Sequence, residues 1–236
     1  MRRASSSTVP TPSLSKRPRN ANATREAILR SALIAFSQSG YDGVGVREIA
    51  GEAGVTAMLV NRYFGSKEKL FAAAVETIFS EGELLNGDIA TLSRHAAGFL
   101  VGGTASDASP TGELRADPLL LMLRSAASPQ AAAILRDGLE RHFQQPLAAS
   151  LPGIDVRERA VLFLGLVAGF QLMYRVIGAK PLVEADPELL AKRLESMFQL
   201  LVSPPQRRSE APAPKSETFG ADRLAEHGPI KAAADL

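Results

Sequence analysis

Between residues 23 and 203, apolar residues recur at every third or fourth position, and no segment alternates apolar and polar residues as a half-buried strand does. A chain with this one periodicity buries its apolar surface by packing helices against each other. We therefore expect an all-α fold. The pattern predicts a first helix that is capped by Thr24 and ends at Gly40. Over the whole chain it predicts helices at residues 24–39, 46–53, 56–64, from 66 onward, 88–101, 113–127, 129–151, 155–177 and 187–201.

The two ends of the chain differ from this helical middle. Residues 1–22 are rich in Ser, Pro and Arg, and residues 204–236 are rich in Pro, Ala and charged residues. Neither end has enough apolar surface to offset the entropy lost on ordering, so we expect both to be disordered. We expect the middle to divide into a small domain over residues 23–84 and a larger helical domain over residues 85–203.

Composition excludes several classes of protein. The chain has no Cys, which rules out disulfides, thiolate zinc sites and cysteine nucleophiles. Arg2 and Arg3 are followed by a polar segment that contains prolines, unlike an export signal. The most apolar stretch, residues 160–173, is too short to cross a bilayer. We expect a soluble cytoplasmic protein without a membrane partner.

Residues 46–64 have the pattern of a helix-turn-helix. Ile49 and Val60 lie on apolar helix faces, Gly54 suits the tight turn between the two helices, and Thr56 suits the cap of the second. A second helix packed in this way points several side chains outward, toward a major groove: Ala57, Met58, Asn61 and Arg62. From the pattern alone, an ordinary helical hairpin is the alternative.

The segment GYDGVGVREIAGEAGVTAMLVNRYFGSKEKLF resembles the DNA-binding domain of the tetracycline-repressor (TetR) family of regulators. The order GY, REIA, AGV, RYF, SKEKLF carries this resemblance, which runs from residue 24 to residue 75. It implies a three-helix DNA-binding domain in a homodimer that binds a double-stranded DNA operator. It also implies a helical C-terminal domain that dimerises through its last two long helices and binds a small-molecule effector.

The resemblance implies two groups of DNA contacts. Ala57, Met58 and Asn61 would face bases, and a second group would contact bases or phosphates: Arg47, Thr56, Arg62, Tyr63 and Lys67. Chemistry supports these roles, because arginine forks onto guanine, the Asn61 amide pairs with adenine, and a methyl such as that of Ala57 meets the thymine methyl. Lys67, in the first turn of its helix, adds a cation to amides suited to phosphate.

Three positions depart from the family pattern and leave the base preferences open. The family usually has Ser or Thr where Gly45 stands, a small residue where Met58 stands, and Tyr where Asn61 stands. The larger Met58 would change how deeply the helix docks. The departures leave the scaffold intact.

A basic arm precedes the first predicted helix. Lys16, Arg17 and Arg19 lie there, whereas acidic residues outnumber basic ones between residues 24 and 83. The small domain alone therefore attracts DNA weakly, and we expect the arm to enter the adjacent minor groove, where negative potential favours Arg. The alternative is a solvated tail without DNA contacts.

Two surfaces of the C-terminal domain follow from the resemblance. The dimer interface would be formed by apolar side chains and by two glycines that let the helices approach closely. These residues are Ala160, Leu164, Gly165, Val167, Gly169, Leu172, Leu190, Leu194, Met197 and Leu201. The effector pocket would be lined by Phe99, Met122, Phe143, Phe170, Met173 and Tyr174, with polar groups from Arg124, His142 and Gln171. In both cases the alternative is that these side chains fill the core of the monomer.

No pattern indicates catalysis, a cofactor or a metal. The three His residues, at positions 95, 142 and 227, lack helical partners that would complete a zinc site. Gly102 and Gly103 lack the lysine of a phosphate-binding loop, and no serine has the G-x-S-x-G setting of a nucleophile.

The leading hypothesis is therefore a regulator, most simply a repressor, released from its operator by an effector. The alternative is an architectural or partner-controlled DNA-binding protein without a ligand. The sequence leaves open the effector, the operator, the regulated genes and the direction of regulation.

Overall fold

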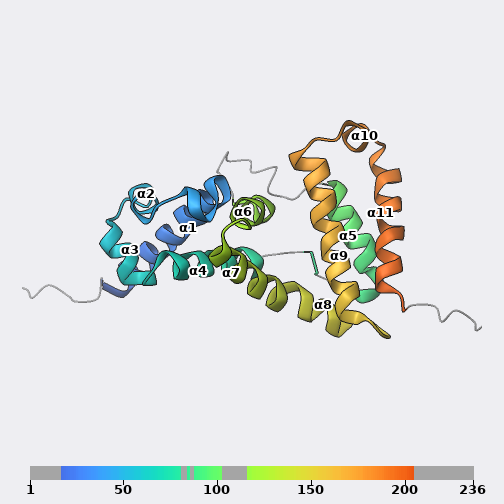
Figure 1. The fold of residues 1–236 in the computed structure, drawn as a ribbon, viewed down its shortest axis with the longest axis horizontal. Helices are drawn as coiled ribbons and strands as arrows, with labels where there is room; N and C mark the ends of the chain where they lie inside the picture. The colour runs from blue at the N-terminus through green and yellow to red at the C-terminus, as the bar shows by residue number, and fades with distance from the viewer. Residues whose placement is uncertain (1–16, 81–83, 86–87, 103–115, 205–236) are drawn as a thin grey trace, which may run out of the picture. The chain divides into compact units, whose positions relative to one another are not determined.

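The computed structural model describes residues 17–80, 84–85, 88–102 and 116–204 (Figure 1). These residues form helices and connecting turns, and none of them is in a strand. The expected all-α class is confirmed.

Helix α1, Arg17–Gly43, is 27 residues long. It begins seven residues before the predicted cap, so Thr24 lies inside the helix and the expected disorder of residues 17–22 is wrong. The predicted stop at Gly40 is confirmed, because Gly40 has φ 73° and ψ 177° and breaks the helical path there. A short helical turn after Gly40 completes α1, which ends at Gly43.

Three helices follow closely: α2, Val46–Glu52, α3, Ala57–Phe64, and α4, Lys67–Ser80. Each agrees with its predicted position to within a residue. The Ser66 hydroxyl accepts the Lys69 N–H at 3.2 Å and caps α4, although the two side chains form no capping box.

The next helices are α5, Ile89–Gly102, α6, Pro118–Ser125, α7, Pro129–Leu139, and α8, Gln145–Ser150. Helix α6 starts later than predicted, because the Asp117 carboxylate caps it by accepting the N–H groups of Leu119 and Leu120. A π-helical turn, Glu140–Gln144, joins α7 to α8. The predicted helix over residues 129–151 is therefore one helical run with a π turn inside it.

The last helices are α9, Val156–Gln171, α10, Lys180–Val183, and α11, Pro187–Val202. A second π turn, Leu172–Val176, extends α9. Helix α10 was not predicted, because four residues are too few to show a period. The helical run 156–176 is long and apolar enough by composition to cross a membrane. A core helix of a soluble protein can have the same composition, and helices α5 and α11 pack against this run, although only 28% of its apolar window is buried.

Two apolar cores hold the helices together. The first core brings α1 to α4 together with α6 and α7, and its fully buried side chains include Phe36, Phe71 and Leu121. Phe36 and Phe71 meet edge to face, with ring centroids 5.0 Å apart. The close approach of α4 to α7 depends on Gly138, because a Cβ there would lie 2.8 Å from a methyl of Val75.

The second core lies among α5, α8, α9 and α11. Phe163 and Phe198 are fully buried there, with ring centroids 4.5 Å apart. Figure 1 shows α5, α9 and α11 running side by side. Arg159 of α9 is also buried, and its guanidinium donates to the carbonyl oxygens of Leu201 and Val202 at the end of α11 and of Pro152 and Ile154 before α9.

Candidate nucleic-acid interface

Helices α2 and α3 form a helix-turn-helix. Gly54 in the turn has φ 67°, a conformation that glycine adopts without strain. The N–H of Gly54 donates to the Gly51 carbonyl at 3.1 Å, and the N–H of Val55 donates to the Ala50 carbonyl at 2.9 Å. The Thr56 hydroxyl accepts the Leu59 N–H at 3.4 Å, so the predicted cap of α3 is confirmed.

The inner face of this motif is part of the first core. Ile49, Ala50, Val60 and Phe64 are buried, which confirms the predicted apolar positions Ile49 and Val60. The guanidinium carbon of Arg25, on α1, lies 4.9 Å from the centroid of the Phe64 ring. Helix α3 is therefore fixed along its inner face and at its end, which orients its outer face rigidly.

The outer face of α3 consists of Met58, Asn61 and Arg62, spaced at i, i+3 and i+4. All three side chains are exposed. Ala57 is half-buried and packs against the first core, so its predicted outward direction is only partly correct.

The other predicted DNA-binding residues lie around this face. Arg47, on α2, and Thr56 are exposed. Tyr63 is half-buried and packs against the first core, which leaves only part of its side chain accessible to DNA.

Lys67 is half-buried at the start of α4. Its ammonium nitrogen lies 4.5 Å from the centroid of the Tyr41 ring, which fixes the position of this cation. Burial, together with the nearby charges of Glu68 and Asp42, raises the pKa of Tyr41, so its ring carries no charge at neutral pH. Lys69, which the sequence prediction did not include, is exposed in the same helical turn as a second cation.

The departure at Gly45 has a local compensation. Gly45 precedes α2 and has no side chain to cap it, but its N–H donates to the Glu48 carboxylate at 3.5 Å. The spacing G-x-x-E is the sequence signal for this contact.

The predicted basic arm falls mostly outside the described residues. Lys16 is not among them, whereas Arg17 and Arg19 lie in the first turn of α1. The sequence places these two residues before the first helix, whereas the structure places them within it.

Helix α6 is held against the end of α1 by several polar contacts. The Ser125 hydroxyl accepts the Tyr41 N–H at 3.0 Å, and the Arg124 guanidinium donates to the Ser37 carbonyl. The Ser128 hydroxyl lies 3.3 Å from the Asp42 carboxylate. The segment that leads from α1 into the helix-turn-helix is thus bound to the C-terminal end of α6.

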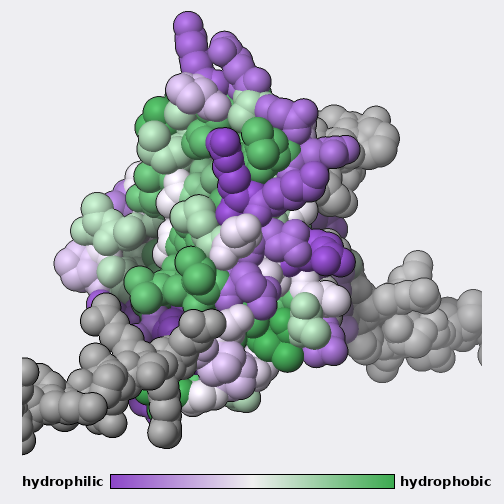
Figure 2. All heavy atoms as spheres, turned by 90° about the vertical axis from the view of Figure 1, so that its right-hand side faces the viewer, coloured by the Kyte–Doolittle hydropathy of each residue, from purple (hydrophilic) through white to green (hydrophobic). Residues whose placement is uncertain are grey.

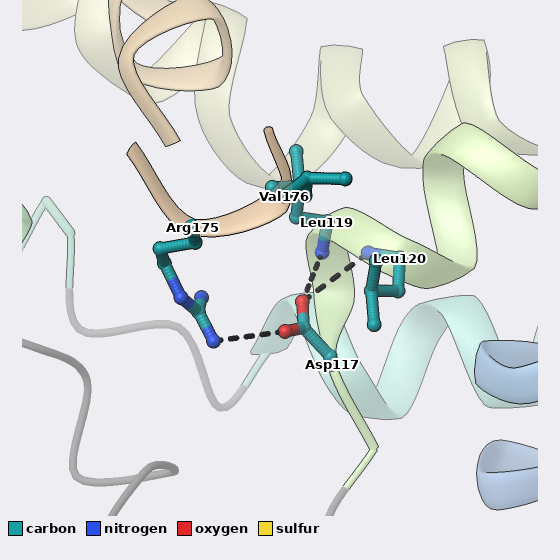
Figure 3. A pocket seen from close by; sticks show the side chains of 5 residues that line it. All are labelled: Asp117, Leu119, Leu120, Arg175 and Val176. Carbon is teal, nitrogen blue, oxygen red and sulfur yellow. Dashed lines mark hydrogen bonds and ion pairs between the residues drawn. The ribbon is translucent and has the colours of Figure 1, made fainter. Parts of the chain in front are cut away.

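The N-terminal end of α6 borders a cavity of about 370 Å³ (Figure 3). Its lining residues are Asp117, Leu119, Leu120, Arg175 and Val176. The Arg175 guanidinium donates to the Asp117 carboxylate at 3.0 Å, and both side chains are mostly buried. The cavity therefore combines apolar walls with one ion pair between α6 and the π turn of α9.

The predicted effector residues do not line this cavity. Phe99, Phe170 and Tyr174 belong to the second core, where Phe170 and Tyr174 stack. Met122 and Phe143 pack against the first core, and Phe143 meets the Phe79 ring at 5.3 Å.

The other predicted effector residues are also scattered. Arg124 contacts α1, Met173 is exposed and Gln171 is half-buried. His142 Nε2 lies 3.0 Å from Oε1 of Glu76, and the other carboxylate oxygen of Glu76, Oε2, accepts from Arg141 at 2.9 Å. These residues do not form one pocket in this structure.

Comparison with known proteins gives two family matches. The model described as "Bacterial regulatory proteins, tetR family" matches residues 28–74, and "Tetracyclin repressor-like, C-terminal domain" matches residues 108–202. The HTH-type transcriptional repressor NicS of Pseudomonas putida is 38% identical over 64 residues. The HTH-type transcriptional regulator RutR of Escherichia coli is 43% identical over 63 residues.

Each of these two matches covers 27% of this chain and only 30% of the relative. A solved structure of a transcriptional regulator from Rhodococcus sp. Rha1 is similar over a larger part: it is 27% identical, with a TM-score of 0.51, over 75% of this chain and 95% of that one. The two family models together match more than half of the 236 residues. The chain therefore belongs to the TetR family of bacterial regulatory proteins.

Proposed function

We propose that this protein is a cytoplasmic, sequence-specific DNA-binding transcriptional regulator that acts as a homodimer and leaves its operator when a small-molecule effector binds. The observation that carries the proposal is the outer face of α3. Its exposed side chains project from a helix whose opposite face is buried in the first core. A short helix held in this way presents base-contacting groups to a major groove.

The polar side chains of this interface have distinct roles. The Asn61 amide pairs with the edge of an adenine, and the Arg47 and Arg62 guanidinium groups bind guanine or phosphate. Lys67 and the exposed Lys69 bind phosphates beside α4.

Dimerisation follows from an exposed apolar face on α9 and α11. This face consists of Val161, Leu162, Gly165, Gly169, Met173, Leu189, Met197 and Leu200. Figure 2 shows the side on which α11 lies, where hydrophobic residues reach the surface between hydrophilic ones. Such a face is covered in a dimer by the same face of a second copy.

This apolar face corrects the predicted dimer contacts. Ala160, Val167, Leu190 and Leu194 are buried in the second core of the monomer, so the core alternative holds for them. Gly165, Gly169 and Met197 do lie on the exposed face, and a Cβ at either glycine would meet no atom within 4 Å.

The cavity between α6 and the π turn of α9 supports the effector response. Its volume lies within the range of small-molecule sites, and its ion pair would orient a polar ligand. A ligand there contacts one end of α6, whose other end holds the segment leading into the helix-turn-helix. Ligand binding that favours one position of α6 thereby changes the affinity for DNA.

Selection of bound fragments from random DNA by the full chain tests DNA binding. We expect two inverted half-sites separated by about one duplex turn or slightly more, because a two-fold dimer presents two copies of α3. Failure to enrich any sequence, or enrichment of a single asymmetric site by a monomer, would contradict the proposal.

Thermal unfolding with a panel of metabolites tests the effector response. A true effector raises the melting temperature with its concentration and releases the selected DNA. Arg175→Met should abolish both effects, and Arg175→Lys should keep part of them. If compounds fail in both measurements while DNA binding stands, the protein is the ligand-free architectural or partner-controlled alternative.

A further inference from the structure

Met58 has the largest exposed fraction of the large apolar side chains that the structure describes, 81%. It is the second residue of α3 and lies one helical turn before Asn61 and Arg62 on the same outer face. With so little of it buried, the side chain adds almost nothing to the first core. An apolar group therefore stands at the N-terminal end of a face that is otherwise polar.

The surroundings of Met58 do not suit a protein-docking patch. Such a patch needs several contiguous apolar side chains. Across the described residues 46–80, Met58 is the one large apolar residue that is exposed. Its exposed neighbours on α3 carry an amide and a guanidinium, which suit DNA.

In the major groove, the apolar group that base pairs present is the C5-methyl of thymine. The first residues of a recognition helix are the ones that contact base edges there. We infer that Met58 contacts this methyl group in each half-site and makes the protein select thymine at that position. The inference rests on the proposed function and names a base that the interface selects.

The spacing on α3 adds a constraint on the operator. Residues three apart on a helix have Cβ atoms about 5–6 Å apart. Successive base pairs are stacked about 3.4 Å apart. Met58 and Asn61 therefore contact pairs that are adjacent or separated by one. The half-site should contain a thymine and an adenine, bound by Met58 and Asn61 respectively, within this distance.

Replacement of thymine by deoxyuridine tests the inference, because uracil differs from thymine only by lacking the methyl. With the selected duplex, each thymine is replaced in turn. One thymine in each half-site should be sensitive. Loss of its methyl in one half-site should weaken binding by the wild-type chain about fourfold, and loss in both half-sites about fifteenfold. Thymines elsewhere should tolerate the replacement.

Substitution of Met58 provides the matched comparison. Met58→Ala should bind the thymine and uracil duplexes equally, whereas Met58→Leu, of similar size, should keep most of the difference. With a C·G pair at the sensitive position, 5-methylcytosine should bind the wild-type chain more tightly than cytosine, and Met58→Ala should not distinguish them. Because Met58 is exposed, circular dichroism melting should show the variants folded as the wild type.

Two results would overturn the inference and leave the proposed function standing. One is a selected duplex in which no thymine responds to uracil. The other is an equal uracil response in the wild-type chain and in Met58→Ala. Failure to enrich any sequence would instead refute the proposed function and this inference with it.

Discussion

The two apolar cores differ in how completely the chain covers them. Among the large apolar side chains that are exposed in the described residues, all except Met58 and Leu123 lie between residues 154 and 200. The first core is thus closed by the chain itself, whereas the second leaves α9 and α11 with apolar surface open to solvent. Under the proposed function, the first core supports the surface that binds DNA, and the exposed apolar surface of the second core is covered by a second copy.

Gly40→Ala tests whether the first core is self-contained and should have the largest effect. A Cβ at Gly40 would overlap the carbonyl oxygen of Arg124, and the backbone there has a positive φ. We expect a loss of about 3 kcal/mol or more in the free energy of unfolding, from strain and displacement of α6. Urea unfolding measures it. Gly45→Ala is the control, since its Cβ would meet no atom within 4 Å; equal losses in the two variants would refute the argument.

Leu200→Glu tests whether a second copy completes the second core. Leu200 is 80% exposed on α11, so the monomer should fold normally. In the dimer the substitution buries an unpaired carboxylate. We therefore expect the dissociation constant of the dimer to rise at least about 100-fold, which corresponds to close to 3 kcal/mol. Sedimentation over a range of concentrations measures it. Ala133→Glu, which adds the same charge at an exposed site on α7, should leave assembly unchanged. A Leu200→Glu dimer of normal affinity would remove α11 from the interface.

Asn61→Ala tests whether the outer face of α3 selects bases. Asn61 is exposed, so stability should not change. Binding to the selected duplex should weaken by roughly 1–3 kcal/mol, with relaxed preference at one position per half-site. Lys67→Ala should instead weaken binding to all sequences similarly, because phosphate contacts carry no sequence information. If both variants lost specific and random DNA equally, the role of Asn61 would be wrong.

Glu76→Gln tests the contact between α4 and the π turn Glu140–Gln144 and should have the smallest effect. Hydrogen bonding to His142, with the charges of His142 and Arg141, lowers the pKa of Glu76. Its stabilisation is therefore present above its ordinary pKa of 4.5 and is lost as the pH falls through the lowered value. Because the carboxylate is largely exposed, we expect at most about 0.5 kcal/mol at pH 7. The difference in melting temperature between variant and wild type should vanish in acid; a difference that persists there would implicate packing.

The helix-turn-helix could be predicted from sequence because its determinants are local. Gly54 meets a backbone requirement, Thr56 caps a helix, and Val60 and Phe64 repeat at helical spacing. The early start of α1 was missed because the segment RPRNANAT is polar.

The proposed effector site and the proposed dimer face could not be predicted in the same way. Helical spacing shows that Val167 and Leu194 are apolar positions, but it does not show whether the monomer or its partner covers them. The cavity depends on Asp117 and Arg175, which lie far apart in sequence and meet only through the fold.

The contact that Arg159 makes between α9 and α11 differs in its pH dependence from the contacts that involve carboxylates. The partners that the structure gives its guanidinium are all carbonyl oxygens, which do not titrate. Arginine itself stays protonated at any pH that the chain survives. Acid that neutralises Glu76 therefore leaves this contact unchanged, and in an acid titration the ends of α9 and α11 should be among the last parts of the second core to separate.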